Sequence, residues 1–153
     1  MEIRKGGNHQ MKKIYFDMDG TIANLYGVEG WLDYILAQNA LPYEQAKPMV
    51  NMNVLARKLN MLRANGYEVC VISWLAKGSN EAYDRKVIKA KKKWLKKHLA
   101  SVQFDEIHIV AYGTPKQSLG NGILFDDEIG NRVAWGEGAF EPNDIFAVLN
   151  GLA

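Results

Sequence analysis

Acidic side chains follow a short apolar run near the start of the chain, in the order Asp17-Met18-Asp19-Gly20-Thr21. A second pair, Asp126-Asp127, follows another apolar run much later in the sequence. Carboxylates that meet in a small space repel one another unless a cation lies among them. Oxygen ligands suit Mg²⁺, which needs only one or two carboxylates from the protein. We therefore expect Asp17 and Asp126, with Asp127 as a further candidate, to bind Mg²⁺.

A hydroxyl and a lysine extend this set of polar groups. Ser73 ends the apolar run 67–73, and Lys116 comes soon after the run 106–110. A divalent cation, a lysine, a hydroxyl and the N–H groups of a glycine-containing turn together can hold a phosphoryl group. In such a site one carboxylate can attack phosphorus, and an acid two residues further on can serve as general acid and then as base.

The elements that must position these groups alternate along the chain. The apolar runs predict strands, and apolar residues at helical spacing predict helices between them. Strands that are apolar throughout and alternate with helices favour a parallel sheet covered on both faces, with its chemistry at the carboxyl ends of the strands. We expect strands at 13–17, 67–73, 106–110, 122–125 and 136–140, helical segments at 24–65 and 80–99, and a last helix from 143 or 144 to 149.

Proline and glycine suggest where these segments are interrupted. The stretch 41–48, with Pro42 and Pro48, is expected to separate two helices. Gly20 would allow the sharp turn that brings Asp19 to face the site.

The helix expected at 80–99 is strongly basic. Residues 85–98 hold one arginine, seven lysines and no acid. We expect the apolar residues to share one buried face and the lysines, Lys91 among them, to form a solvated face, which is the common role of such charges. The alternative is that this helix binds a nucleic acid through its phosphates. The apolar face would consist of Val87, Ile88, Trp94, Leu95, His98 and Leu99.

Composition bounds the class of protein. The chain has 153 residues, 48% of them hydrophobic and 24% charged, which is typical of one globular domain and excludes disorder and low-complexity repeats. No apolar run approaches the roughly 18 residues that span a membrane. Cys70 is the single cysteine and has no partner for an internal disulfide, so we expect a reducing cytoplasmic location. We expect 1–12 to be a flexible extension and 13–153 one domain, in which 24–65 is an insert.

Four segments together resemble the haloacid dehalogenase (HAD) superfamily of phosphohydrolases. They are DMDGT at 17–21, VCVIS at 69–73, Lys116, and ILFDD at 123–127, and the resemblance extends over 13–150. It implies a Rossmann-like three-layer α/β fold whose parallel strands have the order five-four-one-two-three. It also implies a Mg²⁺ ion bound by Asp17, by the backbone carbonyl of Asp19 and by an acid of the 126–127 pair.

The same resemblance implies a role for each side chain. Asp17 would be the nucleophile and Asp19 the general acid and base. Ser73 and Lys116 would hold the phosphoryl oxygen atoms, and Lys116 would also offset the charge near Asp17.

Further segments resemble the 5′(3′)-deoxyribonucleotidases within that superfamily. They are DMDGTIANLY at the start, KKKWLKKHL on the basic helix, and FDEIHIV after it. This closer resemblance implies a (deoxy)nucleoside monophosphate as substrate. The chain departs from that family in having only 56 positions from Asp17 to Ser73, so its cap is reduced. Leu25 stands where that family has an aromatic residue, and Trp74-Leu75 replaces a small residue and a proline.

Candidate substrate-binding residues come from the turn and from nearby aromatic side chains. They are Gly20, Thr21, Tyr26 and Trp74. An aromatic side chain that stacks on a base contributes about 1–3 kcal/mol. Trp31 and Tyr34 could stack in the same way, but packing within the insert is the role we favour for them.

The sequence thus predicts a Mg²⁺-dependent phosphomonoester hydrolase that forms an aspartyl-phosphate. A nucleoside monophosphate is the first choice of a small phosphorylated substrate, and we expect no membrane partner. One alternative is a phosphatase of phosphorylated nucleic-acid ends. Another is a non-catalytic phosphate-binding or protein-interaction module on the same fold, which would have no need for Asp19.

Overall fold

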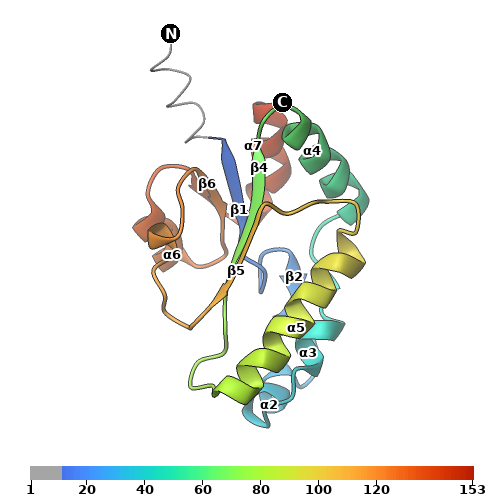
Figure 1. The fold of residues 1–153 in the computed structure, drawn as a ribbon, viewed down its shortest axis with the longest axis vertical. Helices are drawn as coiled ribbons and strands as arrows, with labels where there is room; N and C mark the ends of the chain where they lie inside the picture. Colours follow the sequence, from blue (N-terminus) through green and yellow to red (C-terminus); the bar gives the residue numbers. More distant parts are fainter. Residues whose placement is uncertain (1–11) are drawn as a thin grey trace.

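The computed structural model describes residues 12–153 of the chain. Its central sheet has five parallel strands in the order β5-β4-β1-β6-β7 (Figure 1). This confirms the predicted α/β fold with strand order five-four-one-two-three. Of the extension predicted at 1–12, all but Lys12 lies outside the described residues. The strands are β1 (Lys13–Phe16), β4 (Glu68–Trp74), β5 (Glu106–Val110), β6 (Ile123–Phe125) and β7 (Ala139–Phe140).

Helices cover both faces of the sheet. Helices α4 (Met52–Ala64), α5 (Glu81–His98) and α7 (Ile145–Leu152) lie on one side, and α6 (Ile129–Trp135) lies on the other (Figure 1). Neighbouring residues of a strand point to opposite faces, so Phe16 packs in the core under the first group while Tyr15 packs toward α6. No helix within 12–153 is long and apolar enough to cross a membrane.

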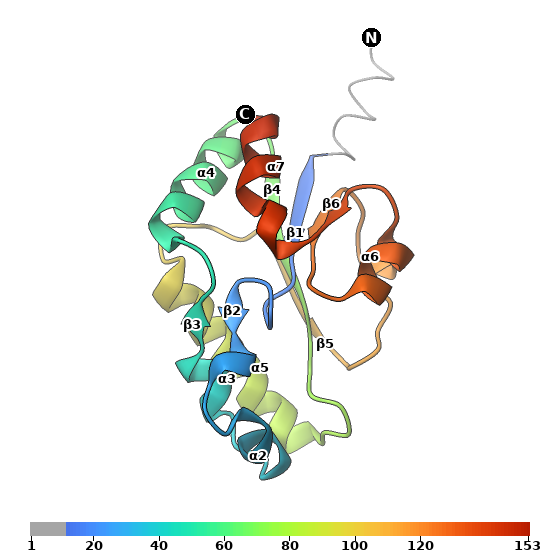
Figure 2. The same ribbon diagram turned by 180° about the vertical axis from the view of Figure 1, so that it is seen from behind.

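The insert after β1 contains two short α-helices, a 3₁₀ turn and a pair of two-residue strands (Figure 2). The two-residue strands β2 and β3 pair antiparallel, which the sequence analysis missed because such strands are too short for a hydrophobic pattern. The expectation of a break at 41–48 is wrong for α3. Pro42 lies in the first turn of that helix, where its missing N–H group would have no partner in any case. The parts are β2 (Ala23–Asn24), the 3₁₀ turn η1 (Leu25–Gly27), α2 (Trp31–Leu36), α3 (Leu41–Gln45) and β3 (Lys47–Pro48).

Helix α5 anchors the insert to the sheet. Its first turn is capped by the Asn80 side chain, which accepts a hydrogen bond from the N–H of Tyr83 at 2.9 Å. Trp94 is buried and donates from Nε1 to the carbonyl of Ala46 at 2.7 Å, which ties the end of the insert to α5. The helix therefore connects the insert to the strands that carry the polar residues of the predicted site.

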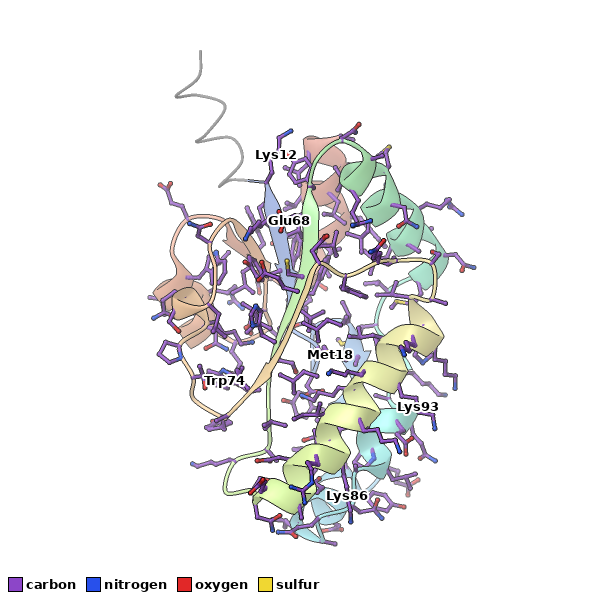
Figure 3. The ribbon with its side chains drawn as sticks, viewed as in Figure 1. Lys12, Met18, Glu68, Trp74, Lys86 and Lys93 are labelled. Atoms are coloured by element: carbon purple, nitrogen blue, oxygen red, sulfur yellow. The ribbon has the colours of Figure 1, made fainter. Side chains whose placement is uncertain are left out.

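One lysine of α5 departs from the predicted solvated face. Lys86 and Lys93 project from the outer side of the helix (Figure 3). The side chain of Lys91 is only 1% exposed and points inward. Position 91 lies four residues after Val87 and three before Trp94, so it shares the buried face with them. The expectation that all the lysines are solvated is wrong for Lys91.

Candidate active site

Asp17 is the first residue beyond β1, and its position depends on a tight turn. The carbonyl of Met18 accepts hydrogen bonds from the N–H groups of Thr21, Ile22 and Ala23 at 2.9–3.1 Å. Gly20 completes this turn with a φ of +80°, which favours glycine. A β-carbon at Gly20 would also collide with the carboxylate of Asp127. The glycine therefore lets the two acidic segments approach each other.

Lys116 joins the two acidic segments. Its ammonium group donates to Asp17 Oδ1 at 2.9 Å and to Asp126 Oδ2 at 2.7 Å. All three side chains are buried. The lysine begins the short 3₁₀ helix η2 (Lys116–Ser118), and its ammonium lies 5.4 Å from the centre of the Trp74 ring. The structure thus brings together three of the residues that the sequence analysis selected.

Thr21 forms a second link between the same segments. Its hydroxyl lies 3.0 Å from Asp17 Oδ2 and 3.3 Å from Asp127 Oδ1, and it accepts a hydrogen bond from the N–H of Asp127 at 3.1 Å. Thr21 is fully buried and lies outside the lining of the cavity described below. Its hydroxyl is engaged within the protein, and substrate binding by Thr21 stays a prediction.

Asp126 is held from several directions. Its Oδ1 accepts from the N–H of Glu128 at 2.9 Å, and its Oδ2 accepts from the Asn131 side chain at 3.1 Å in addition to Lys116. Asp127 lies in an exposed position and makes fewer such contacts. Asp127 therefore has more free oxygen atoms to offer a ligand than Asp126 has.

Burial and mutual repulsion change the acidity of these groups. Burial raises the pKa of Asp17 to about 7, against the opposing effect of Lys116 and with a further increase from Asp19 and Asp127. Burial also raises the pKa values of Asp126 and Asp127. For Lys116, burial favours the neutral amine, but the carboxylates of Asp17 and Asp126 outweigh it and raise its pKa. The site is therefore short of positive charge.

Three carboxylates are close enough to share one cation. Oxygen atoms of Asp17, Asp126 and Asp127 lie within 4.8 Å of one another. An all-oxygen donor set of this kind fits Mg²⁺, and a cation would relieve the repulsion that raises their pKa values. The Asp19 carboxylate is outside this group and contacts Lys91 instead. A metal contact through the Asp19 backbone carbonyl, as the sequence analysis expected, stays a prediction.

A cavity of about 450 Å³ opens beside the carboxylates. Its lining includes the polar residues Asp17, Asp19 and Lys116 together with many apolar side chains. The predicted substrate contacts Tyr26 and Trp74 lie in this lining, whereas Gly20 and Ser73 do not. The aromatic residues of the wall are Tyr26, Trp31, Tyr43, Trp74 and Tyr112.

The insert supplies much of the apolar wall. Tyr26 is 49% exposed and packs edge-on against Trp31, with 4.9 Å between the ring centres. Trp31 faces the cavity, but Tyr34 is not among the residues that line it. The preference for packing over substrate contact therefore fits Tyr34 better than Trp31.

Lys91 is the residue of this region that the sequence analysis missed. Its ammonium donates to Asp19 Oδ2 at 2.9 Å, to Ser73 Oγ at 2.6 Å and to the carbonyl of Trp74 at 2.7 Å. It also lies 5.1 Å from the centre of the Tyr43 ring. One signal in the sequence was its helical spacing from Val87 and Trp94, which the surrounding lysines obscured.

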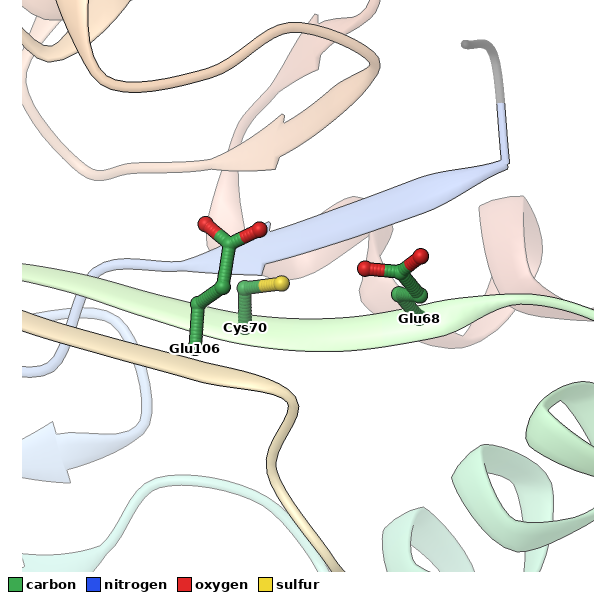
Figure 4. A group of neighbouring side chains, drawn as sticks. All are labelled: Glu68, Cys70 and Glu106. Atoms are coloured by element: carbon green, nitrogen blue, oxygen red, sulfur yellow. The ribbon is translucent and has the colours of Figure 1, made fainter. Parts of the chain in front are cut away.

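A second group of possible metal ligands lies elsewhere on the sheet. Glu68, Cys70 and Glu106 approach one another on neighbouring strands (Figure 4). Burial raises the pKa of the Cys70 thiol to about 12, so the thiol stays protonated at neutral pH. Lys13 already pairs with Glu106 at 3.1 Å and Glu68 at 3.9 Å. This group is an ion-pair cluster that has its own cation.

Comparison with solved structures supports the fold. A D,D-heptose 1,7-bisphosphate phosphatase from Burkholderia thailandensis superposes with a TM-score of 0.56 at 13% sequence identity, over 92% of this chain and 97% of that chain. At that identity the similarity shows a shared fold. No protein-family model and no curated protein sequence matches this chain.

Proposed function

We propose that this chain is a phosphomonoester hydrolase in which Asp17 is the nucleophile. The observation that carries the proposal is the contact of the buried Asp17 carboxylate with Lys116, beside two further acids and at the wall of a cavity. The fold of a sugar bisphosphate phosphatase supports the same general activity. The resemblance of the four sequence segments to HAD phosphohydrolases agrees with it.

The reaction has two steps. In the first, an Asp17 oxygen forms a bond to phosphorus while the ester P–O bond breaks, and Asp19 gives its proton to the leaving oxygen. In the second, a water molecule transfers a proton to Asp19 and its oxygen binds phosphorus as the bond to Asp17 breaks. The products are an alcohol and inorganic phosphate, and Asp19 is protonated again.

Lys116 and the acids prepare the site for this chemistry. The lysine holds one Asp17 oxygen and supplies positive charge where the phosphoryl group must approach other anions. Asp17, Asp126 and Asp127 are the residues that would hold Mg²⁺. When bound, the metal supplies charge that offsets the phosphate and the carboxylates.

We also propose a nucleoside monophosphate as the substrate. Aromatic side chains, Tyr26 and Trp74 among them, line the same cavity as the carboxylates. Flat apolar walls favour a planar base, whereas a sugar with many hydroxyl groups needs polar partners. The insert that carries Tyr26 supplies part of this wall in place of a larger cap.

The test is phosphate release with Mg²⁺ from a panel of nucleoside monophosphates, sugar phosphates and 5′-phosphorylated oligonucleotides. We expect turnover of nucleoside monophosphates, and Asp17→Asn should reduce it to the background rate. Asp33→Asn, which changes an exposed acid on α2, is the matched control and should leave it intact. Turnover that persists in Asp17→Asn would contradict the nucleophile.

The same panel separates the rival functions. Preference for the oligonucleotide, with a steep loss of activity as salt increases, would favour a phosphatase of nucleic-acid ends that binds through the α5 lysines. Absence of hydrolysis across the panel, together with measurable Mg²⁺ binding, would favour a non-catalytic module.

A further inference from the structure

Lys91 is the buried cation of this region that the reaction above does not use. It reaches from α5 to the ends of two other segments, where it contacts Asp19 after β1 and both Ser73 and Trp74 in β4. We propose that Lys91 is a positioning residue, which holds Asp19 and Ser73 in the arrangement that transfer of a proton to the leaving group requires. This proposal rests on the proposed hydrolase function.

The burial of Lys91 indicates a specific role. An ammonium group loses its hydration on burial, a cost that is recovered only through well-placed partners. The other lysines of α5 are exposed, whereas Lys91 is 1% exposed. Its three N–H donors meet three acceptors, and none of these acceptors lies on α5. A helix that needed only stability would do better with an apolar residue at this position.

The direction of the hydrogen bonds shows what Lys91 can do for its neighbours. An ammonium group can only donate, so Asp19 Oδ2 and Ser73 Oγ must both act as acceptors toward it. The Ser73 hydroxyl therefore keeps its own proton for another acceptor. Within residues 12–153 the Ser73 hydroxyl makes no other hydrogen bond. Because Oδ2 of Asp19 accepts from Lys91, the proton that Asp19 transfers is carried on its other oxygen, Oδ1.

Lys91 also lies directly behind the wall of the cavity. Asp19 and Tyr43 both line the cavity, and Lys91 contacts both of them from the side of α5. Without Lys91, the Asp19 side chain would lose its only hydrogen bond to another side chain within the described part of the chain. It would then be free to turn away from the leaving group.

Leaving-group dependence distinguishes positioning of the acid from a general structural role. A nucleoside leaves as an alkoxide and needs the proton of Asp19, whereas p-nitrophenolate leaves readily without one. The parameter kcat/KM covers only the steps up to departure of the leaving group, so the later hydrolysis of the aspartyl-phosphate does not affect it.

The experiment compares Lys91→Met with Lys92→Met, which changes the adjacent exposed lysine, on a nucleoside monophosphate and on p-nitrophenyl phosphate. We expect Lys91→Met to lower kcat/KM about 10²-fold on the nucleotide and far less on p-nitrophenyl phosphate. Asp19→Asn should show the same selectivity, and the double variant should lose little more than Asp19→Asn alone. Lys92→Met should match the wild-type chain on both substrates.

Two results would overturn the positioning role. One is an equal loss of kcat/KM on both substrates in Lys91→Met while Asp19→Asn remains selective. The other is no loss on the nucleotide. Denaturant unfolding shows whether Lys91→Met folds, and if it does not, Lys91→Gln, which keeps N–H donors, is compared in the same way. A wild-type chain inactive on both substrates would instead contradict the proposed function itself.

Discussion

Lys116 and Asp17 are separated by 99 positions in the chain, yet the lysine ammonium donates to the aspartate carboxylate at 2.9 Å. The same ammonium contacts Asp126, whose side chain is fully buried. One lysine therefore pairs with two buried carboxylates at the carboxyl edge of the sheet. The stability of this edge and its chemistry depend on the same side chain.

Replacement of that lysine should cost stability as well as activity. Lys116→Met leaves two buried carboxylates without their cationic partner, and removal of one member of a buried ion pair destabilises a protein by about 3–5 kcal/mol. Urea unfolding at neutral pH measures the loss, with the exposed Lys86→Met as control. Addition of Asp126→Asn to Lys116→Met should recover part of the stability. If Lys116→Met unfolds at the same urea concentration as the wild-type chain, the ion pairs of Lys116 with Asp17 and Asp126 do not contribute this stability.

Mg²⁺ should stabilise the folded chain through the acidic group. At a Mg²⁺ concentration 100 times the Kd, a single site adds about 2.7 kcal/mol to the free energy of unfolding. Thermal unfolding with and without Mg²⁺ should show this increase in the wild-type chain and in Asp33→Asn, but a smaller one in Asp127→Asn. Removal of the metal by a chelator should abolish phosphate release, and added Mg²⁺ should restore it. An unchanged Mg²⁺ effect in Asp127→Asn would place the metal elsewhere.

Tyr26 should contribute to substrate selection through stacking on the base. Loss of one stacking partner costs about 1–3 kcal/mol, so Tyr26→Ala should lower kcat/KM about 5- to 150-fold on a nucleoside monophosphate. Ribose 5-phosphate, which has no base, should be much less affected. Tyr34→Ala is the matched control, because Tyr34 lies on the same insert but outside the cavity lining. Equal losses on both substrates would mean that Tyr26 supports the insert and does not contact a base.

The link between Asp105 and Arg63 should make stability depend on pH. Arg63 donates to Asp105 at 3.0 and 3.2 Å, and the N–H of Val69 donates at 2.8 Å. The Arg63 hydrogen bonds, with a smaller contribution from Val69, lower the pKa of Asp105. A lowered pKa in the folded state gives stability that is complete above the unfolded pKa of about 3.9 and is lost as the pH falls through the folded value.

Asp105→Asn should therefore be less stable than the wild-type chain at neutral pH, by about 1–2 kcal/mol. The difference should shrink as the pH falls below about 4, where the wild-type carboxylate also takes up a proton. Urea unfolding between pH 3 and pH 7 checks this, with the exposed Glu137→Gln as control. A difference that stays constant with pH would show that the charge on Asp105 is not responsible.

Much of the fold follows from local patterns. The runs that form β1, β4 and β6 are apolar because both faces of these strands are covered, and such runs can be recognised without a structure. The boundaries of the first four predicted strands moved by at most one residue, and the fifth strand, β7, is shorter than predicted. The first turn of α3 could not be predicted in this way. A proline usually indicates a break in a helix, but Pro42 lies in the first turn, where a proline does not interrupt the helix.

The site residues, like the fold, were predictable from the sequence only in part. Residue types and their places after predicted strands were enough to select Asp17, Lys116, Asp126 and Asp127, because parallel strands end at a common edge. Which groups contact each other depends on distances across the sheet and between layers, and these arise only when the helices pack. Lys91 is the clearest example. It is one of seven lysines on a single helix, and only the packing of α5 against β4 buries it beside Asp19.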